Sequence, residues 1–447
     1  MDRLPGIGSA PPLPPRRSLP PGGAPVAPAD GLQLTGSTAP APAAPARPSV
    51  EEAALYLAGR SGRILHQGRI LKPNHFPRIH QESLQQGRSP QPLVAGAPNF
   101  RRVGRQRIYG VGQPTVEGLK EVLARLDAAP GGKGRVVWTN MREEPVLYIN
   151  GRPHSAHDLE SPNVNLESPG LSPRQVEAQE ERLKAEVLAE AARHGGRLLL
   201  HDQMPDGSHA PRWERVESVR TVKEVYRDLQ EQGWRVDYAR IPVSDEKSPE
   251  PQDFDALLRR LQGAPPEAHL VFNCHMGRGR TTTAMVVADL WRRARGGEPR
   301  VRPRVQTFSR QPAVHQDIRE QGRRQRSQYR IILSLIQALE QGPRSKQEAD
   351  SVIDRFACLQ NLRRAVDEHY RAAAAADCPD RARHLRQRAG HFLHRYFHLI
   401  ALDAYLKEQA RGGTSGTFAE WLLRHPDLSE MVGYLHWSLG LPAPGGR

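Results

Sequence analysis

The sequence predicts an α/β protein in which short strands alternate with helices, followed by a helical C-terminal region. Four brief apolar or β-branched runs between turn residues are typical of buried strands. From residue 348 onward, apolar residues recur only with helical spacing. Strands that alternate with helices favour a largely parallel sheet. The four runs occupy residues 135–139, 197–201, 236–243 and 269–273.

Six groups of apolar residues with helical spacing locate the helices. Gly233 and Gly263 predict the ends of the first two, since glycine readily terminates a helix. The groups in the α/β part are Val219, Val222, Val225 and Leu229; Phe254, Leu257, Leu258 and Leu261; and Ala284, Val287, Ala288 and Trp291. The groups in the C-terminal part are Ile353, Phe356, Ala357 and Leu359; Phe392, Tyr396, Ile400 and Tyr405; and Phe418, Trp421 and Leu422.

The N-terminal segment differs in composition from the rest of the chain. Residues 1–50 hold 13 of the 40 prolines and no aromatic residue, so they cannot bury enough apolar surface to offset the entropy of ordering. We expect a disordered arm at 1–50, an α/β domain at 65–345, a helical subdomain at 346–437 and a tail at 438–447. The arm is compatible with a linker, a docking tail or a signal for delivery into a host cell.

No apolar run approaches the roughly 20 residues that a membrane helix requires, and the first residues lack the apolar core of a secretory signal. We expect a soluble cytoplasmic protein, or alternatively an effector delivered to a host cell without a cleaved signal peptide. The three cysteines show neither a disulfide framework nor a CxxC metal spacing. We therefore expect no metal and no other cofactor.

The net charge of +15 predicts acidic partners. Residues 292–330 contain 12 arginines against three acidic residues, which predicts a positive surface, although a solvated face in an arginine-rich chain is an equally good interpretation. A polyphosphorylated small molecule fits this charge. Nucleic acid is disfavoured, because aromatic residues are not interleaved with the arginines.

The stretch VFNCHMGRGRTTT places Cys274 six residues before Arg280. Spacing alone is weak evidence among 56 arginines, and Cys358 also precedes an arginine, Arg364, by six residues. The flanks separate the two cysteines. Cys274 lies between a strand pattern and a helix pattern, whereas Cys358 lies inside a helical pattern without glycine. We interpret Cys358 as a small buried side chain.

The turn at Cys274 has the composition of a phosphate cradle. Gly277 and Gly279 allow the backbone N–H groups to point inward at a helix N-terminus, an arrangement that attracts phosphate and favours a reactive thiolate. The planar fork of Arg280 can hold two oxygens of a phosphoryl group in transfer. The hydroxyl of Thr281 is expected to bond the sulfur. The sequence therefore predicts a cysteine nucleophile that attacks phosphorus.

A thiolate nucleophile also needs an acid for the leaving oxygen and a base for water. Asp245 lies in the loop that follows the strand pattern 236–243, which makes it the candidate. Asp253 and Asp255 lie at the start of the next helix, where acidic residues commonly serve as caps. A purely structural turn aspartate is the alternative interpretation of Asp245.

These residues resemble the cysteine phosphatases that share a Cys-x5-Arg-Thr/Ser loop, and within them the paladin-like and bacterial phytase-like inositol polyphosphate phosphatases. The similarity spans about residues 65–437. Asn273 stands where many relatives have histidine. The motifs that carry the resemblance occur at 70–77, 97–103, 109–115, 136–153, 240–255, 272–283, 352–366 and 394–406.

The resemblance implies a protein-tyrosine-phosphatase-like central sheet flanked by helices. It implies Cys274 as nucleophile through a phosphocysteine intermediate, Arg280 as phosphate clamp and Asp245 as general acid. The expected substrate-binding residues are His275, Met276, Gly277, Arg278, Gly279, Thr281 and Arg142.

Two features of the loop suggest the substrate. Relatives that act on inositol phosphates often carry basic residues at the positions of His275 and Arg278, and two extra cations suit a substrate with several phosphates. Arg142, in the segment MREEP, resembles a motif of the phytase-like relatives. It is expected either near the substrate or in an ion pair that supports the fold.

Three functions remain open at this level. The first is an inositol polyphosphate phosphatase. The second is a protein-tyrosine or dual-specificity phosphatase with a phosphoprotein partner. The third is a non-catalytic module that binds polyanions or a partner through residues 292–330.

Overall fold

The computed structural model describes residues 47–74, 94–296 except 167, 205 and 246, and 330–438. These residues belong to one compact unit, Pro45–Arg447. Almost all of the expected disordered arm, nearly all of the arginine-rich segment 292–330 and nearly all of the tail 438–447 lie outside the described residues.

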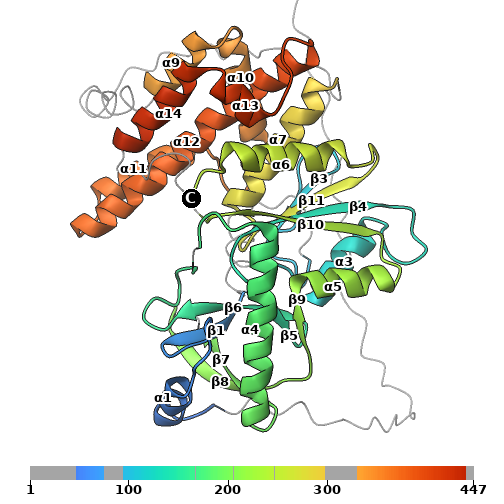
Figure 1. Cartoon of the computed structure of the whole chain (residues 1–447), viewed down its shortest axis with the longest axis vertical. Helices are drawn as coiled ribbons and strands as arrows, with labels where there is room; N and C mark the ends of the chain where they lie inside the picture. The colour runs from blue at the N-terminus through green and yellow to red at the C-terminus, as the bar shows by residue number, and fades with distance from the viewer. Residues whose placement is uncertain are drawn as a thin grey trace, which may run out of the picture. The chain divides into compact units, whose positions relative to one another are not determined.

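The central sheet has five strands in the order β10-β4-β11-β3-β2 (Figure 1). The first four are parallel, and only β2 runs antiparallel to its neighbour. The predicted largely parallel sheet is therefore confirmed. Its strands are β2 (Arg101–Arg102), β3 (Ile108–Val111), β4 (Val136–Arg142), β10 (Val236–Val243) and β11 (His269–Asn273).

Helices cover both faces of this sheet. The side chains alternate along each strand, so that Val271 packs with the helices on one face and Leu270 and Phe272 pack with those on the other. The first face carries α3 (Val116–Arg125) and α5 (Val222–Glu231), and the second carries α6 (Pro251–Gln262) and α7 (Gly279–Ala294).

A second, antiparallel sheet was not expected. It has the strand order β1-β6-β5-β9 and lies beside a separate hairpin of β7 and β8. The run 197–201, predicted as a strand of the main layer, instead forms the start of β7 in this hairpin. The bounds are β1 (Arg69–Pro73), β5 (Leu147–Ile149), β6 (Arg152–Asp158), β7 (Arg197–Gln203), β8 (His209–Arg215) and β9 (Val219–Thr221), with helices α1 (Val50–Ala58) and α4 (Pro173–Arg193).

One predicted helix begins later than its apolar spacing suggests. Val219 belongs to β9, and α5 begins at Val222. Thr221 ends the strand because its side chain accepts the N–H of Glu224, whose carboxylate in turn accepts the N–H of Thr221. This reciprocal capping box fixes the start of the helix.

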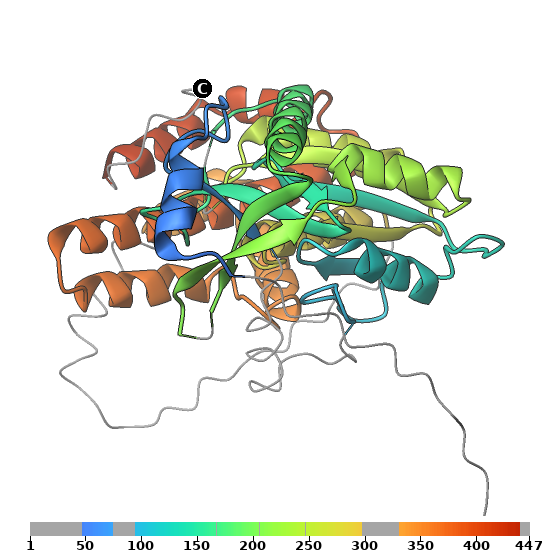
Figure 2. The same cartoon turned by 90° about the horizontal axis from the view of Figure 1, so that it is seen from below.

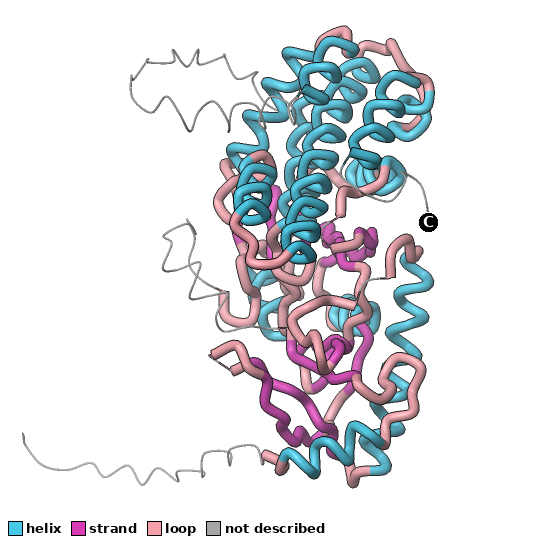
Figure 3. Tube along the Cα trace, turned by 90° about the vertical axis from the view of Figure 1, so that its left-hand side faces the viewer, coloured by secondary structure: helices cyan, strands magenta, loops and turns pink. Residues whose placement is uncertain are grey.

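The C-terminal helices pack against α6 and α7, which cover the second face of the central sheet. One continuous apolar cluster joins Phe272 of the sheet and Val286 of α7 to Phe397 of α12. In Figure 2 the two orange helices α11 and α12 run side by side, and Figure 3 shows the helical region from another side. A boundary at residue 346 stays a prediction. The helices are α9 (Arg330–Ala338), α10 (Gly342–Arg355), α11 (Arg364–Ala374), α12 (Pro379–Ala410), α13 (Phe418–Leu423) and α14 (Pro426–Ser438).

The placement of Cys358 in a helix was wrong. Helix α10 ends at Arg355, and residues 356–359 form a turn. Asn361 separates α10 from α11, because its side chain accepts the N–H groups of Arg363 and Arg364 and donates to Asp354. An asparagine that bonds backbone N–H groups two and three residues ahead competes with helix continuation.

Within the part of the chain that the structure describes, every helix falls short of the combined length and apolarity needed to cross a membrane.

Buried histidines predict a loss of stability at acidic pH. His394 and His398 of α12 are 1% and 2% exposed, and His394 bonds His436 of α14 at 3.0 Å. Burial lowers the pKa of His394 well below its ordinary value and lowers that of His398 to about 4. Because the unfolded chain takes up protons near pH 6.5 and the folded chain does not, the free energy of unfolding should fall as pH drops from about 6.5 toward 4.

Urea unfolding between pH 7.5 and 4.5 measures this effect. His398→Phe, which keeps an aromatic ring beside Phe254 and Phe418, should reduce the pH slope by up to about 1.4 kcal/mol per pH unit. The same substitution at exposed His66 is the matched control. Identical slopes in the wild type and the His398 variant would contradict the prediction.

Candidate active site

The turn between β11 and α7 has the predicted strand-loop-helix form. Cys274 follows the last residue of β11 and Gly279 opens α7. Gly277 has φ of +72°, and a Cβ atom there would lie 2.5 Å from the backbone nitrogen of Gly112. Only glycine fits, because both the backbone conformation and the space exclude a side chain.

Neighbouring segments hold this loop from outside. The side chain of Asn99 donates to the carbonyl of Met276 at 2.9 Å, and the N–H of Gln113 donates to the carbonyl of His275 at 2.8 Å. Sequence reasoning missed both residues, although they lie in the motifs 97–103 and 109–115.

Asn273 locks the end of β11 to the sheet. Its side-chain amide donates to Gln113 and Asn140 at 3.2 Å each and accepts from Trp138 at 2.8 Å. The side chain is fully buried. A neutral amide with three partners thus fixes the residue before Cys274, where many relatives carry histidine.

Arg280 lies at the centre of a buried network of charges. Its Nη1 is 3.1 Å from Glu144 and donates to the carbonyl of Val243 at 3.0 Å, while its Nε is 3.2 Å from Asp245. Arg280 and Glu144 are 1% and 4% exposed. The guanidinium is therefore fixed in orientation by two carboxylates and one carbonyl before any substrate arrives.

Arg142 occupies the far side of Glu144. Its Nε is 3.0 Å from Glu144, and its Nη2 donates to Asn74 and Ser155. Burial alone would raise the pKa of Glu144, but Arg280 and Arg142 outweigh it and lower that pKa to about 2. Of the two roles expected for Arg142, this position matches the supporting ion pair, since the residue does not line the cavity described below.

His275 differs from its expected role as a cation. The ring is 7% exposed. Burial, followed by the charges of Arg142, His157 and Arg280, lowers the pKa of His275 well below its ordinary value. The lowered pKa favours a neutral ring over the cation expected at this position, and the role of His275 in binding a substrate stays a prediction.

One cavity collects the expected catalytic groups. Its volume is about 570 Å³, and Cys274, Asp245 and Arg280 all line it. Met276, Arg278 and Gly279 line it too, whereas His275, Gly277 and Thr281 lie outside its wall. The hydroxyl of Thr281, expected at the sulfur, instead donates to the carbonyl of Val111 at a long 3.5 Å.

Cys358 lines the same cavity, which corrects its interpretation as a buried structural residue. Behind the loop, Arg101 is 2% exposed and donates to Thr282 at 2.9 Å. Burial lowers the pKa of Arg101, and the thiols of Cys358 and Cys274 act in the opposite direction. A buried cation thus lies near both sulfur atoms, and no local pattern in the sequence distinguishes it from the other arginines.

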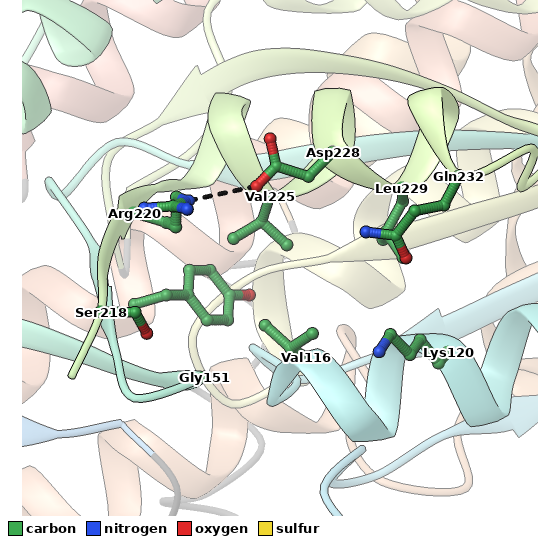
Figure 4. A pocket seen from close by; sticks show the side chains of 10 residues that line it. Val116, Lys120, Gly151, Ser218, Arg220, Val225, Asp228, Leu229 and Gln232 are labelled. Atoms are coloured by element: carbon green, nitrogen blue, oxygen red, sulfur yellow. Dashed lines mark hydrogen bonds and ion pairs between the residues drawn. The ribbon is translucent and has the colours of Figure 1, made fainter.

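A second, smaller cavity of about 190 Å³ lies between α3 and α5 (Figure 4). Its wall includes Lys120 and an ion pair of Arg220 with Asp228 at 3.1 Å. It contains no cysteine. Among the described residues, no group of three or more His, Cys, Asp or Glu side chains is arranged to hold a metal ion.

The parallel sheet, the glycine-bearing β11–α7 turn and the buried arginine define a protein-tyrosine-phosphatase-like fold. A family model described as PTP-like phytase, inositol hexakisphosphate, matches residues 139–292. The structure resembles a tandemly repeated protein tyrosine phosphatase-like phytase from Mitsuokella multacida, with TM-score 0.50, 15% identity, and coverage of 80% of this chain and 48% of that one.

The curated relatives include paladin. Human paladin is 31% identical over 337 residues, and mouse paladin is 32% identical over 332 residues; each alignment covers 72% of this chain and 35% of the relative. The chain thus spans about a third of the length of these relatives. Together the matches support a paladin-like or phytase-like member of the protein-tyrosine-phosphatase superfamily, which confirms the resemblance in the motifs.

The charge network predicts a large cost for neutralising Glu144. Glu144→Gln keeps the shape of the side chain but leaves Arg142 and Arg280 without their shared buried counter-charge. Removing one charge of a buried ion pair typically costs about 3–5 kcal/mol. The free energy of unfolding, measured in urea, should therefore fall by roughly that amount. Glu117→Gln, which breaks an exposed pair with Lys120, should cost less than about 1 kcal/mol. Similar losses in both variants would refute the assigned role.

Proposed function

We propose that the chain is a cysteine-dependent phosphatase that hydrolyses phosphomonoesters, with inositol polyphosphates as its substrate class. The observation that carries the proposal is the shared cavity of Cys274, Asp245 and Arg280, whose wall is rich in arginine. The match of residues 139–292 to a phytase family described by inositol hexakisphosphate supports the same substrate class.

The first step transfers the phosphoryl group to sulfur. The substrate phosphate enters the loop, and the Cys274 thiolate attacks phosphorus as the bond to the leaving oxygen breaks. Arg280 stabilises charge on the phosphoryl oxygens. Its Nη2 is buried without a hydrogen-bond partner among the described residues, so one arm of the fork is available to a phosphate oxygen.

Asp245 changes partner when the substrate binds. In this structure it pairs with Nε of Arg280 and accepts a bond from Asn165 at 2.7 Å. A bound phosphate competes for that Nε. Released from Arg280, Asp245 acts in its protonated form as the general acid and donates its proton to the leaving oxygen.

The second step regenerates the enzyme. Water attacks phosphorus of the phosphocysteine, the sulfur leaves as thiolate, and Asp245, now a carboxylate, accepts the proton of the water. Inorganic phosphate is released. The positive charge of the cavity wall favours any phosphorylated substrate. A phosphotyrosine peptide, hydrolysed by the same mechanism, is therefore the alternative substrate.

Removal of the nucleophile tests the mechanism. Cys274→Ser should lower phosphate release from inositol hexakisphosphate by about 10⁴-fold or more, because no thiolate remains to form the intermediate. Cys378→Ser, at an exposed position, should retain wild-type activity. Rapid acid quench should trap phosphate on Cys274 in the wild type. Equal release by the wild type and Cys274→Ser would refute the proposal, and far faster turnover of a phosphotyrosine peptide would change the substrate class.

The role of Asp245 has a separate test. Asp245→Asn should lower kcat for inositol hexakisphosphate by about 10²–10⁴-fold, the usual contribution of a general acid. The loss should be smaller for p-nitrophenyl phosphate, because p-nitrophenolate leaves without needing a full proton. Equal losses for both substrates would assign Asp245 to positioning of Arg280 and not to proton transfer.

A further inference from the structure

The helical C-terminal region contributes most of the residues that line the active-site cavity. Besides the catalytic loop, the wall is formed by the turn after α10 and by facing side chains of α11 and α12. On α12, Arg388, Phe392 and Arg395 recur at the spacing of one helix face. On α11, Arg364 and Glu368 lie one turn apart and line the same space.

Arg395 links this helix face to the catalytic loops. It is 1% exposed, and its Nη2 donates to the carbonyl of Lys247, two residues beyond Asp245. Its Nη1 lies so near Gly279 that a Cβ atom there would be 3.3 Å away. The cationic face of α12 therefore begins at the phosphate loop itself and does not form a separate surface patch.

The charge of the cavity wall exceeds what one phosphate needs. Five arginines line it, at 278, 280, 364, 388 and 395, against the two carboxylates of Asp245 and Glu368. Arg278 and Arg364 form no ion pair with any described carboxylate. Arg388 lies two helical turns from Arg395, about 10 Å along the axis at the usual rise per residue, so these cations extend away from the loop.

We propose that Arg364 and Arg388 form a second phosphate subsite, which holds a non-reacting phosphate of a polyphosphorylated small molecule while the loop holds the reacting one. The inference rests on the proposed function and adds the residues that select for several phosphates. Guanidinium groups suit this task because they bind phosphate through paired, charge-assisted hydrogen bonds. Glu368 lines the same space and opposes this positive charge.

The subsite predicts a change in selectivity and not only in rate. The selectivity is the ratio of kcat/KM for inositol hexakisphosphate to kcat/KM for p-nitrophenyl phosphate. In the double variant Arg364→Ala/Arg388→Ala this ratio should fall at least tenfold, mainly because KM for inositol hexakisphosphate rises. Arg386→Ala on the exposed side of α12 is the matched control and should leave the ratio unchanged. An equal fall for both substrates, or a ratio like that of the control, would overturn the subsite.

Binding measurements separate this inference from the catalytic proposal. Calorimetry with Cys274→Ser and inositol hexakisphosphate should show at least tenfold weaker binding when Arg364 and Arg388 are also replaced by alanine, and a smaller dependence of affinity on salt. If the wild type hydrolyses nothing but this difference persists, the catalytic proposal fails and the subsite stands. If hydrolysis occurs and the difference is absent, the subsite fails alone.

Discussion

The buried carboxylate of Glu144 is the contact on which the site depends. It lies between Arg142 and Arg280 and forms an ion pair with each. Arg142 also bonds Asn74 and Ser155. Arg280 also contacts Val243 and Asp245. A lone arginine at 1% exposure would be very costly. Glu144 offsets that cost and fixes the direction in which Arg280 presents its remaining N–H groups.

This network also joins the two sheets. Arg142 ends β4 of the central sheet, while its partner Ser155 belongs to β6 of the antiparallel sheet. Glu180 of α4 repeats the arrangement, because it pairs with Arg240 of β10 at 2.6 Å and accepts the N–H of Val146 at 3.0 Å. The antiparallel sheet is therefore part of the support of the active site, although it contributes no residue to the cavity wall.

The parts of the fold and of the site that the sequence predicts are those specified by residues close together in the chain. The strands 236–243 and 269–273 match β10 and β11, because short buried runs between turns have few alternatives. Cys274 and Asp245 follow these strands, and parallel strands end at one edge of a sheet, so their meeting in one cavity was within reach of the sequence. Val219 was misassigned, because the capping box at Thr221 overrides the apolar spacing.

The remaining parts of the site had no local signal. A glutamate in a charged segment is ordinarily expected at the surface, so nothing marked Glu144 as a buried bridge. Arg388 and Arg395 lie more than a hundred positions after Cys274. Their contribution depends on how α12 packs against α7. Apolar periodicity predicts that the C-terminal helices pack on the α/β core, but it does not predict the rotation or the register of α12.

The charges of the cavity wall are the reason for proposing a polyanionic substrate. Collecting like charges in a partly enclosed, low-dielectric space destabilises the folded protein, and a chain under no functional demand would pair or expose them. Here Arg280 has two carboxylates, and Arg395 a carbonyl, which hold those two guanidinium groups in place. Arg278 and Arg364 have no described carboxylate. Described carboxylates thus hold the guanidinium that the proposed chemistry needs in a fixed position, while the charges of Arg278 and Arg364 fit the phosphates of the proposed substrate.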